Sequence, residues 1–215
     1  MVELYGYRFS VYSWIARFAL HEKGVSYNWA EVNPFADEAD PEYLAKNPFN
    51  RVPTLVDGAF VLYETSAITR YIDEAFDGPA LQPVDVKDRA RVSQVISIVD
   101  NYTYWPLVRQ VFSHDVFRPR IGSPFDPHEI IRGLESSERT LNALESLVDI
   151  QGYISGPSLT LADIHLAPML SYFIESDKGR AVLEGYDKLR SWFRAVSRRK
   201  GYLDSKPDLP APASQ

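Results

Sequence analysis

The chain of 215 residues contains no cysteine. This absence excludes disulfide bonds, thiolate metal sites and catalysis by a cysteine of the protein itself. The four histidines, His21, His114, His128 and His165, lack the spacing typical of metal ligands, so we expect no metal site.

Long apolar runs are also absent, since no stretch approaches the roughly 18 residues that a membrane span requires. The N-terminus "MVELYGYRFS" has no basic start followed by an apolar core, which argues against a secretory signal. A net charge of −6 argues against general nucleic-acid binding. We therefore expect a cytoplasmic protein with no nucleic-acid and no membrane partner.

What is present indicates two halves of different character. Residues 2–77 alternate strand-like and helix-like segments, and the helical segment "SWIARFALHEKG" ends at Gly24, a typical helix stop. The pair Asp57-Gly58 between two apolar runs predicts a hairpin with a two-residue loop. The expected order is β-α-β-α-β-β-α, with the first two strands parallel and the hairpin completing a small mixed sheet.

The pattern changes after the Pro- and Gly-rich stretch "DGPALQPVD". From about Val86 onward we expect only helices. The predicted organisation is an α/β domain over residues 1–78, a linker over 79–86, an all-α domain over 87–204 and a flexible tail over 205–215.

One helix of the second half has a distinct start signal. In "SLTLADIHLAPMLSYF", Thr160 and Asp163 are spaced as a capping box, with Asp in place of the usual Glu. The helix is apolar nearly all round, which predicts that it is buried and that His165 is a core histidine.

Two dipeptides in "NRVPTLVDGAFVLYETSAI" allow two interpretations each. Taken alone, Val52-Pro53 is a trans proline opening a strand, and Glu64-Thr65 is a helix cap. Alternatively, a cis proline turns the main chain of Val52 toward an extended peptide ligand. Glu64 and Thr65, at a helix N-terminus, then clasp the α-amino-acid end of that ligand.

In combination, these motifs resemble a known family. "VPTL" followed by "ETSAI" is similar to the V/I-P-x-L … E-S-x-A-I pattern of the cytosolic glutathione transferases of the serine-type, bacterial-like kind. Three further segments match in order, so the resemblance covers almost the whole chain: "LYGYRFSVYSWIARFALHEKGVSY", "SLTLADIHLAPML" and "YDKLRSWFRAVSRRKGY". It implies a thioredoxin-like domain followed by an all-helical C-terminal domain, usually as a homodimer.

The resemblance assigns glutathione-binding roles residue by residue. It implies a cis bond at Val52-Pro53, whose main chain pairs with the cysteinyl part of glutathione. Glu64 and Thr65 are expected to hold the γ-glutamyl end, with Thr where Ser is commoner. Arg51 either meets the glycyl carboxylate or is simply solvated.

The resemblance places the catalytic hydroxyl in the loop before the first helix. The register of "ALHEKG" aligns Ser10 with the serine of the family, and Ser13 is then expected to be the N-cap of the helix. Tyr5 and Tyr12 are the alternative hydroxyls, with Ser13 a further fallback. The hydroxyl is expected to donate to the glutathione sulfur and favour its thiolate, which attacks an electrophilic carbon.

The electrophile pocket is expected between the first loop and the long helix that begins near Val86. Its candidates, each equally interpretable as a core or dimer contact, are Tyr7, Phe9, Tyr104, Val108 and Phe112. Asp100, on the same long helix, is a candidate to reach the amine of glutathione across a dimer interface.

The resemblance implies that the chain is a glutathione transferase acting on hydrophobic electrophiles. Two alternatives remain, a glutathione-dependent isomerase or dehalogenase on the same fold and a non-catalytic binding module. Ser10-Val11-Tyr12 stands where the maleylacetoacetate isomerases have Ser-Ser-Cys, which lowers the expectation of that activity. The combined presence of Ser10, Val52-Pro53 and Glu64-Thr65 speaks against a binding module.

Overall fold

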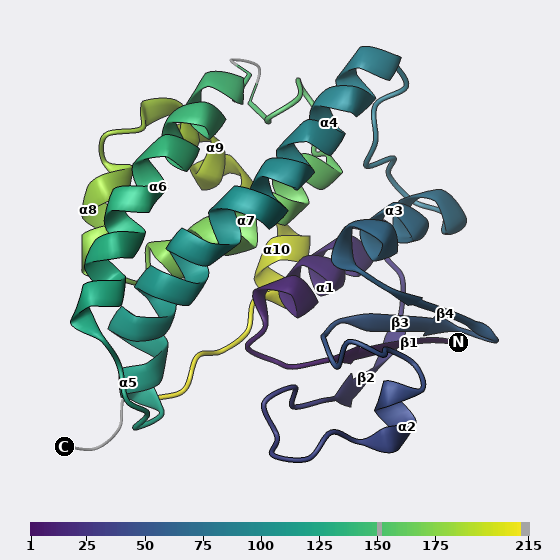
Figure 1. Cartoon of the computed structure of the whole chain (residues 1–215). Helices are drawn as coiled ribbons and strands as arrows, with labels where there is room; N and C mark the ends of the chain where they lie inside the picture. Colours follow the sequence, from purple (N-terminus) through teal and green to yellow (C-terminus); the bar gives the residue numbers. More distant parts are fainter. Residues whose placement is uncertain (150–151, 212–215) are drawn as a thin grey trace. The chain divides into compact units, whose positions relative to one another are not determined.

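The computed structural model describes residues 1–149 and 152–211 (Figure 1). The chain forms two compact units. The first contains Met1–Ala80 together with Lys200–Pro207, and the second contains Leu81–Arg199 together with the described residues from Asp208 onward. The expected fold class is confirmed, a thioredoxin-like β-α-β-α-β-β-α arrangement and an all-helical unit.

The first unit is built on a four-stranded sheet in the order β2-β1-β3-β4. As expected, β1 and β2 are parallel, while β3 pairs antiparallel with β1 and with β4. Its elements are β1 (Val2–Gly6), α1 (Val11–Lys23), β2 (Tyr27–Glu31), α2 (Pro41–Leu44), β3 (Thr54–Asp57), β4 (Phe60–Tyr63), α3 (Thr65–Ala75) and α10 (Lys200–Ser205).

The hairpin between β3 and β4 is confirmed, but its loop is shifted by one residue from the prediction. Asp57 pairs with Phe60, so the two loop residues are Gly58 and Ala59. Gly58 takes the first loop position with φ of 59°, a left-handed conformation that glycine adopts without strain. Asp57 instead extends β3, and its carboxylate accepts a hydrogen bond from Tyr71 at 2.9 Å.

Helix α1 begins one turn earlier than predicted. Ser10, not Ser13, is the N-cap, and its Oγ accepts the backbone N–H of Ser13 at 3.3 Å. The earlier start places Val11 on the buried face with Ile15 and Phe18, which follow at the i+4 and i+7 positions. Both serines have the chemistry of a cap, and burial of Val11 favours the first.

Helix α10 corrects the predicted boundary of the helical domain, because it packs on α1 of the first unit. Its Tyr202 ring lies 5.2 Å from the ring of Trp14 and 5.7 Å from that of Phe18. The indole N–H of Trp14 donates to Ser205 Oγ at 3.0 Å, with both residues buried. The apolar face of α1 is therefore covered by residues that are far away in the sequence.

The predicted linker and tail are anchored where the structure describes them. Lys23 is buried, and its ammonium donates to the carbonyls of Asp73 at 3.0 Å and Pro79 at 3.1 Å. The carbonyl of Leu81 accepts the N–H of Leu161 at 2.9 Å. In the predicted tail, the carbonyl of Pro210 accepts a hydrogen bond from Arg120 at 3.2 Å, and residues 212–215 lie outside the described part.

In its described residues, the second unit consists of helices, as expected, together with an isolated bridge between Tyr153 and Gly156. Its first helix begins at Val86, as predicted, and continues into η1. In the wider turns of η1, an N–H donates to the carbonyl five residues earlier, as the N–H of Arg118 does to the carbonyl of Ser113. The helices are α4 (Val86–Ile98), η1 (Val99–Phe117), α5 (Arg118–Arg120), α6 (Pro127–Leu147), α7 (Leu161–Phe173), α8 (Asp177–Leu183) and α9 (Asp187–Val196).

Helix α7 is the buried centre of this unit, and its capping box is confirmed. The carboxylate of Asp163 accepts the Thr160 N–H at 2.7 Å, the Ile154 N–H at 2.9 Å and the Trp192 indole N–H at 2.7 Å. His165 is fully buried, and burial lowers its pKa to about 3, so it is neutral at ordinary pH. Both residues therefore have the structural roles that were predicted.

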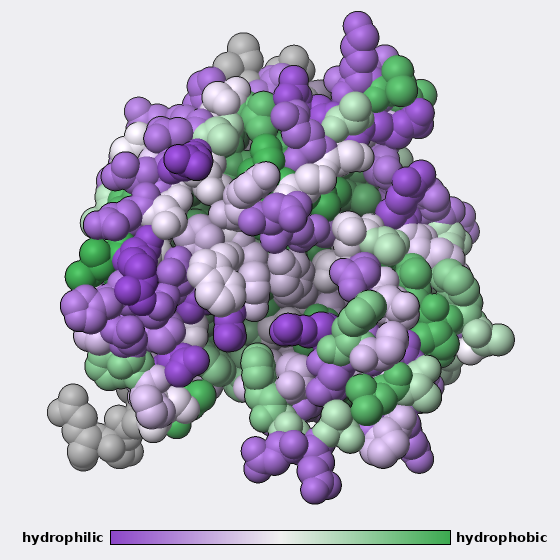
Figure 2. Space-filling model, in the orientation of Figure 1, coloured by the Kyte–Doolittle hydropathy of each residue, from purple (hydrophilic) through white to green (hydrophobic). Residues whose placement is uncertain are grey.

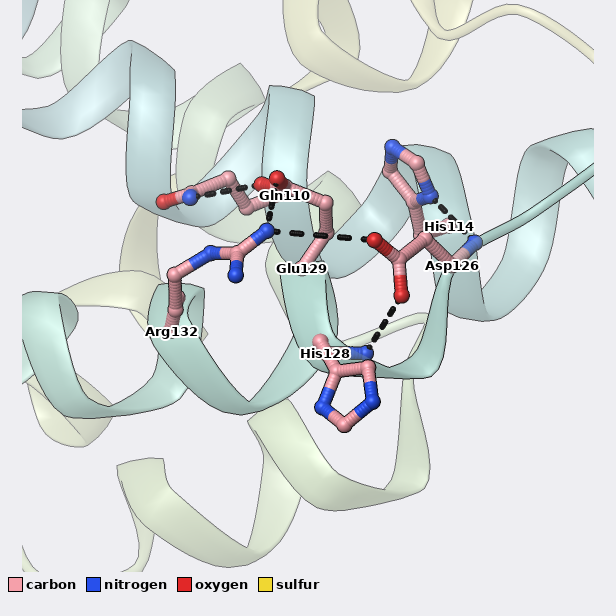
Figure 3. A network of polar contacts seen from close by, with 6 residues as sticks. All are labelled: Gln110, His114, Asp126, His128, Glu129 and Arg132. Atoms are coloured by element: carbon pink, nitrogen blue, oxygen red, sulfur yellow. Dashed lines mark hydrogen bonds and ion pairs between the residues drawn. The ribbon is translucent and has the colours of Figure 1, made fainter.

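A polar network joins η1 to the start of α6 (Figure 3). His114 Nδ1 accepts the backbone N–H of Asp126 at 2.8 Å, and Asp126 in turn caps α6 through the N–H of His128 at 2.8 Å. Beside it, Gln110 donates to Glu129 at 2.8 Å. An acceptor on the imidazole requires its neutral form, because protonation would place a second N–H there.

Candidate active site

Strand pairing brings three predicted site segments to one end of the sheet. Tyr5 near the end of β1 pairs with Thr54 at the start of β3, and Thr54 pairs with Tyr63 at the end of β4. The loop carrying Ser10 follows β1, Val52-Pro53 precedes β3, and Glu64-Thr65 follows β4. Because these three strands are neighbours, the three segments lie side by side at the same end of the sheet.

Ser10 lies half-buried at the N-terminus of α1. Its backbone N–H is fixed by the Tyr7 carbonyl at 2.8 Å. Its Oγ accepts the Ser13 N–H, which uses a lone pair of the oxygen and leaves the O–H proton to donate elsewhere. The partial positive charge of a helix N-terminus at this oxygen favours donation to an anion.

The alternative hydroxyls have other environments. Tyr5 donates to Glu3 at 2.9 Å, and this hydrogen bond, helped by burial, raises the pKa of the phenol. Ser13 has no exposed surface, and its Oγ has no hydrogen-bond partner among the described residues. Tyr12 is half-buried on the first turn of α1. Of these four residues, Ser10 stays the predicted contact to a ligand.

The segment before β3 has two special backbone features. The Val52-Pro53 peptide bond is cis, and Asn50 has φ of 50°, a left-handed conformation that Asn adopts more readily than most residues with a Cβ. The Arg51 side chain is exposed, while its carbonyl accepts hydrogen bonds from Tyr43 at 2.5 Å and Asn47 at 2.8 Å. The sequence analysis missed these last two residues, because nothing in a local pattern links them to Arg51.

Glu64 and Thr65 form the junction between β4 and α3. Glu64 has φ of 73° and ψ of 116°, which is unusual for a residue with a Cβ. Within the described residues its side chain makes no capping hydrogen bond, so the simple helix-cap interpretation does not hold for Glu64. Thr65 is the first residue of α3 and is 8% exposed. The junction offers an exposed carboxylate, a hydroxyl and a helix N-terminus together.

Aromatic rings gather beside the Ser10 loop. Tyr7 packs edge-to-face on Phe9, with ring centres 5.5 Å apart, and on Phe35, with ring centres 5.9 Å apart. Phe35, in the loop after β2, is 62% exposed and was missed because no pattern links this loop to the first one. The three rings form an aromatic cluster next to the candidate hydroxyl.

The candidate residues on the long helix belong to the second unit. Phe112 is buried and stacks on Tyr172 at 4.1 Å, so its ring packs in the helical core. Val108 is 7% exposed, while Tyr104 and Asp100 are half-buried on η1. Their contact with a ligand stays a prediction.

The structure also bears on metal and membrane binding. Among residues 1–149 and 152–211, no group of three or more His, Asp or Glu side chains is arranged to hold a metal ion. No helix in this part of the chain combines the length and the apolar character needed to cross a bilayer.

Comparison with known proteins identifies the family. Residues 4–80 match the model of the glutathione S-transferase N-terminal domain, and residues 127–195 match that of the C-terminal domain. The chain is 30% identical over 196 residues to glutathione S-transferase F10 of Arabidopsis thaliana, covering 89% of this chain and 91% of the relative.

Solved structures agree with this assignment. Glutathione S-transferase III in its apo form is 25% identical, with a TM-score of 0.86 over 100% of this chain and 99% of that one. Glutathione S-transferase I bound with lactoylglutathione is also 25% identical, with a TM-score of 0.84 over 95% of this chain and 98% of that one. The chain therefore belongs to the glutathione S-transferase family, and glutathione S-transferase activity is the activity that these comparisons support.

Proposed function

We propose that this chain binds glutathione at the end of its sheet and activates the thiol through Ser10 for conjugation to hydrophobic electrophiles. The observation that carries the proposal is the position of the Ser10 hydroxyl, which accepts a helix N–H and has its own proton available to a ligand. The hydroxyl lies at the same end of the sheet as Val52 and Glu64-Thr65.

The proposed ligand contacts follow from the chemistry of glutathione. The main chain of Val52, next to the cis Pro53, pairs with the cysteinyl residue as an added strand would. Glu64 holds the ammonium of the γ-glutamyl end, and Thr65 with the N-terminus of α3 holds its carboxylate. Arg51, exposed beside them, is suited to the glycyl carboxylate.

The proposed chemistry is modest. A free thiol has a pKa near 8.5, and lowering it by about two units represents about 2.7 kcal/mol. The thiol proton leaves to solvent, while the Ser10 O–H donates to the remaining thiolate. The thiolate then attacks the electrophilic carbon, forming a C–S bond as the leaving group departs with its bonding electrons. The aromatic cluster of Tyr7, Phe9 and Phe35 would pack against a flat or apolar electrophile.

Substitution of Ser10 can separate its helix-capping role from its catalytic role. Ser10→Ala removes both, and loss of the cap should cost about 1 kcal/mol of stability. Ser10→Asp keeps a cap but has no hydroxyl proton to donate. We expect both variants to raise the thiol pKa of bound glutathione by about one to two units and to slow conjugation of an activated aryl halide roughly 10- to 100-fold at neutral pH. If the thiol pKa of glutathione bound to either variant equals that of glutathione bound to the wild type, Ser10 is not the activating group.

The competing functions differ in turnover. Retention on immobilised glutathione without reaction toward any electrophile would favour the binding module, and turnover of an isomerase or dehalogenase substrate alone would favour those activities. The transferase is favoured here because the hydroxyl, the main-chain edge and the junction at Glu64 occur together.

We also propose a cytoplasmic homodimer, as is typical of this family. Apolar side chains gather on the outer surface of the β3–β4 hairpin (Figure 2), where Phe60 and Val61 are exposed. In the helical unit, Tyr102 is 65% and Trp105 58% exposed. Such side chains suit an interface. Light scattering should give twice the mass of one chain, whereas a monomer would contradict the proposal.

A further inference from the structure

Three buried side chains form a closed ring of hydrogen bonds around the carbonyl of Arg51. Tyr43 on α2 and Asn47 both donate to this carbonyl, at 2.5 and 2.8 Å. Thr54 Oγ1 lies 2.9 Å from the Tyr43 hydroxyl and 3.2 Å from Asn47 Nδ2, which closes the ring. The three side chains belong to residues that are at most 2% exposed.

The protons of this ring can be assigned without ambiguity. A carbonyl only accepts, so Tyr43 must spend its single O–H proton on Arg51. Thr54 must then donate its proton to the Tyr43 oxygen and accept from Asn47. The Asn47 amide is oriented independently, because its oxygen accepts the Phe49 N–H at 3.1 Å. Every proton in the ring has one partner, and burial keeps the Tyr43 phenol protonated by raising its pKa.

We infer that this ring is a positioning device, with Tyr43 as its central residue, for the main chain that receives glutathione. The inference rests on the proposed function. Arg51 directly precedes Val52, so fixing the Arg51 carbonyl limits rotation of the backbone that presents Val52. Asn47 also accepts the Asn50 N–H on its carbonyl at 3.1 Å, which extends the same constraint along the loop.

The ring lies beneath an exposed loop and not within the packed core, so core stability alone does not account for it. Leu55, next along β3, is already fully buried in the sheet, whereas the loop before Thr54 has exposed side chains at Phe49 and Arg51. An exposed loop that must hold a ligand-binding geometry requires internal hydrogen bonds in place of packing. The ring supplies them from side chains that themselves need not touch the ligand.

The test compares Tyr43→Phe with Tyr71→Phe. The control variant, Tyr71→Phe, removes a phenol hydroxyl in the same unit. This hydroxyl donates to Asp57, which lies at the opposite end of β3 from Thr54. Thr54→Val and Thr54→Ser form a second pair, in which only the serine keeps a hydroxyl. For each purified protein we would measure KM for glutathione, kcat at saturating glutathione, and amide hydrogen exchange of residues 47–52 without ligand.

For Tyr43→Phe and Thr54→Val we expect KM for glutathione to rise about fivefold, kcat to change less than about twofold, and exchange of the Phe49 and Asn50 amides to accelerate. Tyr71→Phe and Thr54→Ser should behave as the wild type. A lower melting temperature with unchanged KM and exchange would show that the ring only stabilises the fold, and would overturn the inference. Failure of the wild type to bind glutathione would refute the proposed function instead.

Discussion

At the residue scale, Asn50 and Glu64, two non-glycine residues with positive φ, show how differently the sequence can specify a backbone. Asn50 tolerates its left-handed conformation, because Asn adopts it more readily than most other residues with a Cβ. Glu64 has no such tolerance, and its conformation costs on the order of 1–3 kcal/mol. We expect this conformation to serve binding, because the strained residue exposes a carboxylate at a helix N-terminus.

Replacing Glu64 with glycine should therefore make the protein more stable and less able to bind glutathione. Glu64→Gly relieves the strain at φ of 73°, so we expect the free energy of unfolding to rise by about 1 kcal/mol. Loss of the carboxylate should weaken glutathione binding at least tenfold. Urea denaturation and calorimetric titration measure the two effects. Asn50→Gly is the control for backbone relief, and a destabilised Glu64→Gly would contradict the strain argument.

The residues of the candidate site were predictable to different degrees. Ser10, Val52-Pro53 and Glu64-Thr65 stand in short motifs, so the sequence alone could indicate them. Tyr43 could not be found in this way, because its role depends on a hydrogen bond to the main chain of a residue eight positions away. The choice between Ser10 and Ser13 as the cap depended on burial of Val11, which is a tertiary effect.

At the element scale, the starts of α9 and α6 involve side chains from other elements. Helix α9 has no cap from its own N-cap residue among the described atoms, and the Glu145 carboxylate on α6 accepts the N–H groups of Lys188 and Leu189, each at 2.9 Å. Helix α6 in turn depends on His114 of η1. Apolar periodicity predicted that these helices exist, but it could not predict such caps or the wide turns of η1.

The contact of His114 with α6 should make the stability of the protein depend on pH. Burial, with Arg118 and Arg109 nearby, lowers the pKa of His114, while Glu129 and Asp126 oppose the shift. The unfolded chain has a pKa near 6.5 and therefore binds the proton more readily. The contribution of His114 is fully present above about pH 6.5 and is lost as the pH falls toward the lower pKa of the folded state.

His114→Asn tests this dependence, because the amide oxygen can accept the Asp126 N–H but does not titrate. We expect the urea midpoint of the wild type to fall more steeply between about pH 6.5 and pH 5 than that of the variant. His165, whose pKa is lowered to about 3, titrates in both proteins, so its effect cancels in the comparison. Parallel pH profiles of the two proteins would show that His114 does not control this junction.

At the scale of the whole molecule, the order of elements and both halves of the fold were predictable, because periodicity, a hairpin signal and a linker composition agree with one another. The assignment of α10 was not. Its sequence "KGYLDS" follows a helix of the second unit, and only its packing against Trp14 and Phe18 places it in the first. A boundary drawn along the chain could not show a segment that returns to an earlier unit.

A protein that ends at residue 199 lacks Lys200–Pro207 of the first unit. We expect it to lose more stability than the removal of so short a segment would suggest. Truncation exposes Trp14 and Phe18 and removes the partner of the Trp14 indole, so we expect unfolding of the first unit at a temperature about 10 °C lower or more. Truncation after residue 207, which leaves α10 intact, is the matched control. Thermal unfolding followed by tryptophan fluorescence distinguishes them, and equal melting temperatures would contradict this role of α10.

The return of α10 to α1 also constrains the order of events during synthesis. A nascent chain emerges from the ribosome with its N-terminus first, and a domain usually folds once its own residues are outside. Here the apolar face of α1 in the first unit stays uncovered until Lys200–Pro207 has been translated. By that time nearly all of the second unit is already available to fold. The half of the protein that is made first is therefore completed last.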